Sequence, residues 1–236
     1  MESDTSSLFY MLLLRGAIMN IHVGTQFHRK HLLNTIIMYL KPMEIEWYPV
    51  CDSNEIAAFD DNIEDWIHPI LCEPLQSPPE HACRKLNDFL DSIEINDDDY
   101  YCFLGDDDMY EQGFFDTIRE QTAEIVMCSL SRGNAIPEGA HPHPTYPLII
   151  SGPESVRVYN IGMAQYIMKG KIAKQIRFKN QNNFDDGIFA EELKSRWPNK
   201  IEYLPYLFVF GNYFEPGRYT DDSWKLKDNW RLPVYV

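Results

Sequence analysis

The chain has 236 residues, and its 21 Lys and Arg against 36 Asp and Glu give a formal net charge of −15 with histidine neutral. That length fits one domain, or one domain with a small appendage, and buries enough surface to fold without disulfides or a structural metal. The negative field repels phosphate, so the charge argues against nucleic acid or an anionic membrane as a partner. An anionic ligand would need a local positive charge, which a divalent cation could supply.

The cysteines predict free thiols in a reducing compartment. The five cysteines are Cys51, Cys72, Cys83, Cys102 and Cys128. Their number is odd and they form no CxxC pair, which argues against a zinc ribbon or a disulfide scaffold. Residues 1–18 are interpreted as a leader or an extra element outside the main fold, because their apolar run is short and interrupted by Arg15. No transmembrane segment is expected, and a cytoplasmic location follows as the expectation.

The opening of the main fold has the pattern of a strand, a helix and a second strand. Asn20–Thr25 predicts a strand that ends near a glycine, and Phe27–Leu40 has apolar residues at helical spacing. Glu46–Cys51 predicts the second strand. This order is the unit from which parallel sheets are built.

The middle of the chain continues the alternation. Glu64–Cys72 is a third strand region, and Glu80–Ile93 has one apolar face, as a helix does. Tyr100–Leu104 is continuously apolar, which is typical of a central buried strand. Phe114–Gln121 then predicts a helix and Glu124–Leu130 a strand.

The last part of the chain begins with a change of character. Ser131–Pro147 is rich in Pro, Gly and His and predicts a long irregular loop. Ile161–Lys169 and Asp186–Trp197 are expected to be helices, and Ile201–Phe210 a strand, before an aromatic tail. The fold class is therefore α/β, with a mostly parallel central sheet flanked by helices.

Three aspartates, Asp106, Asp107 and Asp108, directly follow the predicted central strand. Ligands of open α/β sheets bind outside the carboxyl ends of strands, and carboxylates there can hold Mg²⁺ or Mn²⁺. On an extended segment Asp106 and Asp108 would converge on one ion while Asp107 points elsewhere. The alternative is a solvated acidic turn.

Other polar residues lie at or near the ends of predicted strands and helices, where they could contribute to the same site. Asp52 ends the second strand and could accept hydrogen bonds from a nucleobase or ribose, or could simply cap a turn. Lys85 and Asn87 lie on the helix before the central strand. Asp185 and Asp186 begin a later helix, where an acid is often just a cap.

Together these features resemble the GT-A nucleotide-sugar glycosyltransferases, particularly those of family 2, over residues 19–200. In that family a Thr-containing loop follows the first strand, and an Asp that contacts the base follows the second. A helix with Lys and Asn precedes a central strand that ends in a DXD motif, and an acidic pair lies downstream. The residues that match are Thr25, Asp52, Lys85, Asn87, Asp106-Asp107-Asp108 and Asp185-Asp186.

The resemblance implies a GT-A fold in which residues 19–130 bind the nucleotide-sugar and residues 131–236 bind the acceptor. It implies that Asp106 and Asp108 hold Mn²⁺ or Mg²⁺, and that Asp186, or alternatively Asp185, deprotonates the acceptor hydroxyl. The implied reaction moves a sugar from a UDP-, GDP- or dTDP-sugar to a carbohydrate or glycoconjugate with inversion. Donor-binding roles fall on Thr25, Asp52, Lys85, Asn87, Asp106 and Asp107.

The sequence also departs from the family's pattern. The usual Asp-Gly-Ser is Asp52-Ser53-Asn54, and the position before the DXD motif, often Asp, is Gly105. The Gln-x-x-Arg-Trp motif of processive synthases is missing from the sequence, which favours single addition.

Two other classes of function stay open. A metal-dependent nucleotidyltransferase or phosphohydrolase also uses carboxylates at strand ends, but a nucleotidyltransferase usually has a Gly-rich phosphate loop after its first strand. Here the corresponding stretch, residues 24–29, has one glycine. A non-catalytic nucleotide-sugar-binding module is the second alternative.

Overall fold

The computed structural model describes residues 19–60, 63–73, 78–132, 148–158, 161–179 and 185–211. The expected leader, nearly all of the expected loop after residue 130 and the aromatic tail lie outside these residues, as does the end of the half expected to bind the acceptor. Within them the chain forms one eight-stranded sheet with the order β3-β2-β1-β4-β7-β6-β8-β5.

The first half of the sheet is parallel, as the opening strand–helix–strand pattern predicts. β1 pairs with β2 and with β4, and β2 pairs with the short β3, all in parallel. The strands of this half are β1 (Ile21–Gln26), β2 (Glu46–Cys51), β3 (Ile70–Leu71) and β4 (Tyr100–Gly105).

The second half of the sheet is mixed. β7 lies antiparallel between β4 and β6, whereas β6 and β8 are parallel and β5 pairs antiparallel with β8. Four of these seven pairings are parallel, so the α/β fold with a mostly parallel sheet is confirmed. The strands are β5 (Met109–Tyr110), β6 (Ile125–Arg132), β7 (Tyr166–Lys169) and β8 (Ile201–Gly211).

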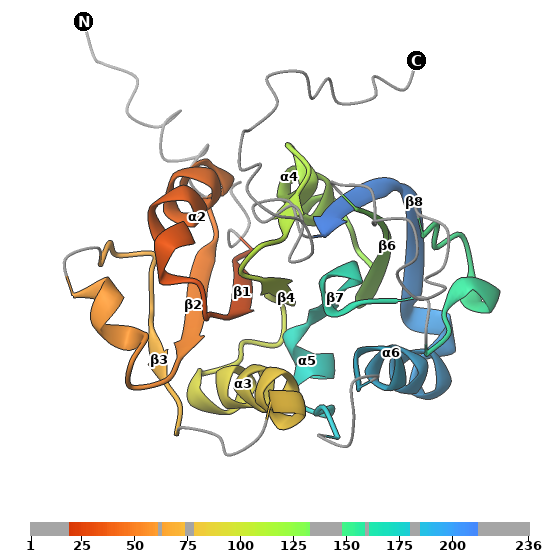
Figure 1. Ribbon diagram of the computed structural model, residues 1–236. Coiled ribbons are helices and arrows are strands. Elements are labelled where there is room, and N and C mark those ends of the chain that lie inside the picture. The colour runs from red at the N-terminus through yellow and green to blue at the C-terminus, as the bar shows by residue number, and fades with distance from the viewer. Residues whose placement is uncertain are drawn as a thin grey trace, which may run out of the picture.

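Helices cover both faces of the sheet. In Figure 1, α2 and α4 lie on one side, and α3, α5 and α6 lie on the other. Each side has its own apolar core. The helices are α2 (Leu33–Leu40), α3 (Pro78–Ser92), α4 (Phe114–Arg119), α5 (Gly170–Ala173) and α6 (Asp185–Arg196). Short 3₁₀ helices occupy Lys30–Leu32, Lys41–Met43, Ile56–Phe59, Pro153–Ser155, Met163–Gln165 and Pro198–Lys200.

The continuously apolar sequence of β4 reflects its place between the two cores. All six of its residues are buried. Tyr100, Cys102 and Leu104 face the core under α2 and α4. Tyr101 and Phe103 face the core under α3 and α6. A strand covered on both faces therefore needs no polar alternation, as predicted.

The helix expected over Ile161–Lys169 is wrong. The chain instead makes a 3₁₀ turn and then β7, whose first three residues are buried. A short apolar run suits a buried strand as well as a helix, and pairing with β4 and β6 on both sides decides between them. The helix expected from Phe27 begins later, since α2 starts at Leu33 after a 3₁₀ turn.

Cys51, Cys72, Cys102 and Cys128 are free and buried, so free thiols are confirmed at these four positions. Among the described residues, no helix is both long and apolar enough to cross a bilayer.

Candidate functional site

The carboxyl ends of β1, β2 and β4 meet at one edge of the sheet. Gln26, the last residue of β1, is level with Val50 on one side and with Gly105 on the other. The three segments that follow these strands are therefore neighbours. This places Asp52 and the three aspartates after Gly105 along one edge, as expected for parallel strands.

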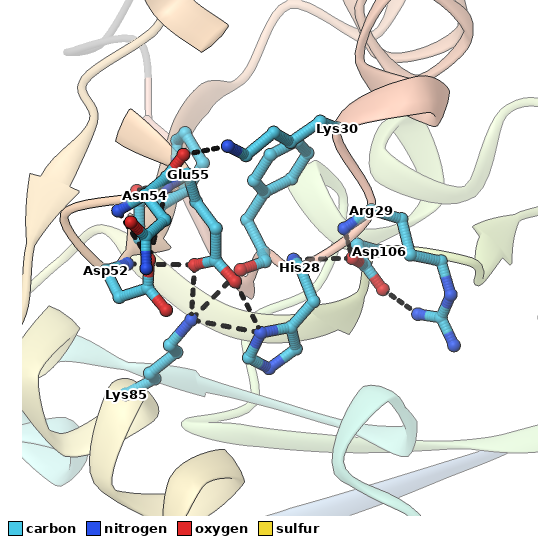
Figure 2. A network of polar contacts seen from close by, with 11 residues as sticks. His28, Arg29, Lys30, Asp52, Asn54, Glu55, Lys85 and Asp106 are labelled. Atoms are coloured by element: carbon cyan, nitrogen blue, oxygen red, sulfur yellow. Dashed lines mark hydrogen bonds and ion pairs between the residues drawn. The ribbon is translucent and has the colours of Figure 1, made fainter. Parts of the chain in front are cut away.

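Asp106 ties the loop after β1 to the end of β4. Its side chain is 2% exposed, and its Oδ2 accepts hydrogen bonds from the backbone N–H groups of His28 at 2.7 Å and Arg29 at 2.8 Å. The guanidinium of Arg29 donates to Oδ1, as Figure 2 shows. Both carboxylate oxygens are thus bound by protein donors.

Asp107 shares the same arginine, because Arg29 Nη2 lies 3.1 Å from Asp107 Oδ2. The alternation expected for Asp106 and Asp108 is wrong, since the chain turns here: the N–H of Asp108 donates to Gly105 at 3.1 Å. A turn does not send alternate side chains to opposite sides.

In this arrangement Asp106 and Asp107 are held by Arg29 rather than gathered around an ion. Among the described residues, no group of three or more His, Cys, Asp or Glu side chains is arranged to hold a metal. Arg29 already forms ion pairs with both Asp106 and Asp107. An ion at Asp106 would have to displace the guanidinium.

Burial and the neighbouring Asp108 raise the pKa of Asp107 from 3.8 to about 7, although Arg29 lowers it. The folded protein therefore binds this proton more tightly than the unfolded chain does. Ionisation of Asp107 therefore lowers the free energy of unfolding. The loss is complete above pH 7 and absent below pH 3.8, where Asp107 is protonated in both the folded and the unfolded chain.

We expect Asp107→Asn to raise the melting temperature at pH 8 and to have little effect at pH 3.5, because asparagine carries no charge to bury. Thermal unfolding at the two pH values measures this, with Asp116→Asn as an exposed control. A variant that is less stable than the wild type at pH 8 would contradict it, and would mean that the Arg29 contact outweighs burial.

Asp52 shapes the turn after β2. Its Oδ1 accepts hydrogen bonds from the N–H groups of Asn54 at 2.8 Å and Glu55 at 3.1 Å. The turn-capping alternative for this residue is therefore present in the structure. A contact of its other oxygen with a base stays a prediction.

Glu55 is a buried carboxylate that the sequence analysis missed. It is 7% exposed and accepts hydrogen bonds from the N–H of Asp52 at 2.8 Å and from Lys85 Nζ at 2.7 Å, and His28 Nδ1 lies 2.8 Å from its carboxylate. These contacts join three segments (Figure 2). A signal was present, because Asp52 and Glu55 have the spacing of a capping box.

Lys85 reaches the site from α3, but its side chain is only 2% exposed. Its ammonium group contacts Glu55 and donates to the backbone oxygen of Phe27 at 3.0 Å. It also lies 3.2 Å from His28 Nδ1. Lys85 therefore lies beneath the loop after β1 and holds it from below.

Thr25 and Asn87 are also held by the protein itself. The hydroxyl of Thr25 accepts a hydrogen bond from the indole of Trp47 at 2.9 Å. The amide of Asn87 bonds both the N–H and the C=O of Phe178, each at 2.9 Å. Thr25 supports the first strands, and Asn87 joins α3 to the segment before α6.

Asp185 and Asp186 form the first turn of α6, where carboxylates complement the helix dipole. Asp185 is 2% exposed. Burial raises the pKa of Asp186 to about 6, against a hydrogen bond from the Met163 backbone that lowers it. The Met163 sulfur in turn accepts a hydrogen bond from Gln26 Nε2 at 3.6 Å. Met163 thus links Asp186 to the end of β1.

No known protein-family profile and no curated protein matches the chain. Among solved structures, S. aureus TarS 1–349 in complex with UDP-GlcNAc is similar at a TM-score of 0.54 and 15% identity, over 80% of this chain and 58% of that one. Another S. aureus TarS structure is similar at a TM-score of 0.55 and 15% identity, over 84% of this chain and 38% of that one. This chain spans less than two thirds of the TarS chains. Such identity shows that the fold is shared with TarS and nothing further.

Proposed function

We propose that the chain is a glycosyltransferase that moves a sugar from a nucleotide-diphosphate donor to a hydroxyl acceptor, using a divalent cation. The observation that carries the proposal is a chain of contacts that connects two acidic segments through the end of β1, since Gln26 is level with Gly105 and contacts Met163. Asp106–Asp108 follow β4, and Asp186 is linked to the end of β1 through Met163. The fold shared with TarS, which is seen with UDP-GlcNAc, supports it.

The acceptor end of the reaction needs a base. Asp186 would take the proton from the acceptor hydroxyl as the oxygen attacks the anomeric carbon and the nucleoside diphosphate leaves from the opposite side. A pKa of about 6 suits a base that works near neutral pH. One displacement of this kind inverts the anomeric centre. Asp185, one residue earlier, is the alternative base.

The donor end needs positive charge, because the leaving diphosphate is anionic. A bound Mn²⁺ or Mg²⁺ would neutralise that charge. Asp108 and Asp106 are the residues proposed to hold the ion, with Arg29 moving away from Asp106. The proposed donor-binding roles stay with five further residues: Asp52, Asp107, Thr25, Lys85 and Asn87. The side chains of Thr25, Lys85 and Asn87 are bound to other parts of the protein, which favours a role in supporting the site over direct contact with the donor.

Membership of family 2 and a cytoplasmic location belong to the same proposal. The first rests on the order of the residue pattern, and the second on the free buried thiols. The nucleotidyltransferase alternative is disfavoured by the loop after β1. Its N–H groups at His28 and Arg29 donate to Asp106, whereas a phosphate-binding loop turns such groups toward its ligand.

Thermal-shift measurements with UDP, GDP and dTDP, each with and without Mn²⁺, test the proposal first. One nucleotide at 100 times its dissociation constant should stabilise the protein by about 2.7 kcal/mol, a rise of about 5–10 °C. Transfer from the matching nucleotide-sugars to a panel of glycan acceptors then separates an enzyme from a binding module. Equal shifts after EDTA treatment would remove the cation from the proposal, and the absence of any shift would overturn the donor class.

A further inference from the structure

We propose that His28 binds the diphosphate of the donor through its Nε2, and that Glu55 positions the ring for this contact. The inference deepens the proposed function, since it names a residue for the leaving group. Nothing in the sequence pattern pointed to His28, which follows the matched Thr25 by three positions.

His28 stands between the two halves of the donor site. Its backbone N–H is bound to Asp106 at 2.7 Å, and its ring is bound to Glu55 at 2.8 Å. Figure 2 shows the ring between Lys85 and Glu55 on one side and Asp106 on the other. A group here lies between the turn proposed for the nucleoside and the acids at the end of β4.

The side chains of His28, Glu55 and Lys85 become less exposed in that order. The His28 side chain is 41% exposed, whereas Glu55 is 9% and Lys85 is 2% exposed. A buried ion pair is a poor source of stability compared with apolar packing, because both ions lose their water. In this structure the pair fixes the orientation of one accessible imidazole, which is what a binding residue requires.

The hydrogen bonds decide which ring nitrogen is available. Nδ1 lies 2.8 Å from Glu55, which can only accept, and 3.2 Å from Lys85, which can only donate, so these contacts engage Nδ1 in either tautomer. Nε2 is then the nitrogen left for a ligand. A phosphate oxygen is anionic, so an N–H at Nε2 would form a charge-assisted hydrogen bond with it, and such bonds are among the strong ones.

The loop after β1 gathers basic residues beside the acidic ones. The segment His28-Arg29-Lys30-His31 is a run of four basic residues in a chain with a net charge of −15. It lies at the sheet edge where Asp106 anchors it. The loop therefore brings positive charge to a donor site that is otherwise acidic.

The test compares His28→Asn with His28→Gln. Asparagine keeps an amide near the position of Nδ1, where it can still donate to Glu55, but has nothing at Nε2. Glutamine places its amide near the position of Nε2. His68→Asn is the matched control, because His68 is also 41% exposed and bound to a glutamate, Glu46, but lies at the opposite end of β2.

Calorimetry measures the dissociation constants of UDP, GDP and dTDP, of their nucleosides, and of inorganic pyrophosphate. The advantage of a diphosphate over its nucleoside should fall about tenfold or more in His28→Asn, recover partly in His28→Gln and stay unchanged in His68→Asn. Pyrophosphate affinity should follow the same order. Melting temperatures confirm that the variants are folded.

Equal diphosphate advantages in the wild type and both His28 variants would overturn the inference and leave the proposed function standing. Pyrophosphate binding that is lost in His28→Asn, with no nucleotide bound by the wild type, would keep the anion site and overturn the proposed function. A wild type that binds neither pyrophosphate nor any nucleotide would overturn both.

Discussion

Asp186→Asn is expected to slow sugar transfer by about 10²–10⁴-fold while nucleotide binding stays unchanged. Asparagine has nearly the shape of aspartate but cannot accept the proton of the acceptor hydroxyl. The backbone N–H of Met163 can still donate to its amide oxygen, so the first turn of α6 should keep its place. Transfer kinetics and calorimetry with the nucleotide that binds measure the two effects separately.

The pH profile gives the same residue a second test. Burial raises the pKa of Asp186 to about 6, and the base must be ionised. The wild-type rate should therefore fall about tenfold per pH unit below pH 6 and level off above it. Asp116→Asn, with the side chain of Asp116 80% exposed on α4, is the control and should keep the wild-type profile. Near-wild-type transfer by Asp186→Asn would remove Asp186 as the base.

Lys85→Met is expected to lower the free energy of unfolding by about 3–5 kcal/mol. Methionine fills the space of the alkyl chain but leaves Glu55 as a buried carboxylate without its ammonium partner. It also removes the hydrogen bond to the backbone oxygen of Phe27. Urea unfolding measures the change, and the melting temperature should fall by about 10 °C.

A surface ion pair provides the comparison. Lys41 lies 2.7 Å from Glu64, and the two side chains are 59% and 39% exposed. Solvent screens such a pair, so Lys41→Met should change the free energy of unfolding by less than about 1 kcal/mol. If the two lysine variants cost the same, the Lys85–Glu55 pair is not the structural anchor described here.

The sequence predicted the parts of the fold that depend on neighbouring residues. The first three elements follow from local periodicity, and the continuously apolar sequence of β4 indicates that this strand is buried. The strand β7 could not be recognised, because its residues are set in place by β4 and β6, which come from distant parts of the chain.

The candidate site divides in the same way. Asp52 and Asp106 could be placed, because a parallel sheet brings the ends of its strands together. The role of Asn87 depends on Phe178, 91 residues later, and no local pattern shows such a contact. The importance of Glu55 likewise appears only when α3 brings Lys85 beneath it.

Asp106 has a consequence for how acidic motifs are used as markers of activity. Its carboxylate fastens the loop after β1 through two backbone N–H groups, whatever ligand the site receives. Selection for folding alone would thus preserve this aspartate in a descendant that had lost catalysis. In relatives of this chain, retention of Asp106 would indicate a conserved architecture, and under the proposed function retention of Asp186 would be the better sign of a working enzyme.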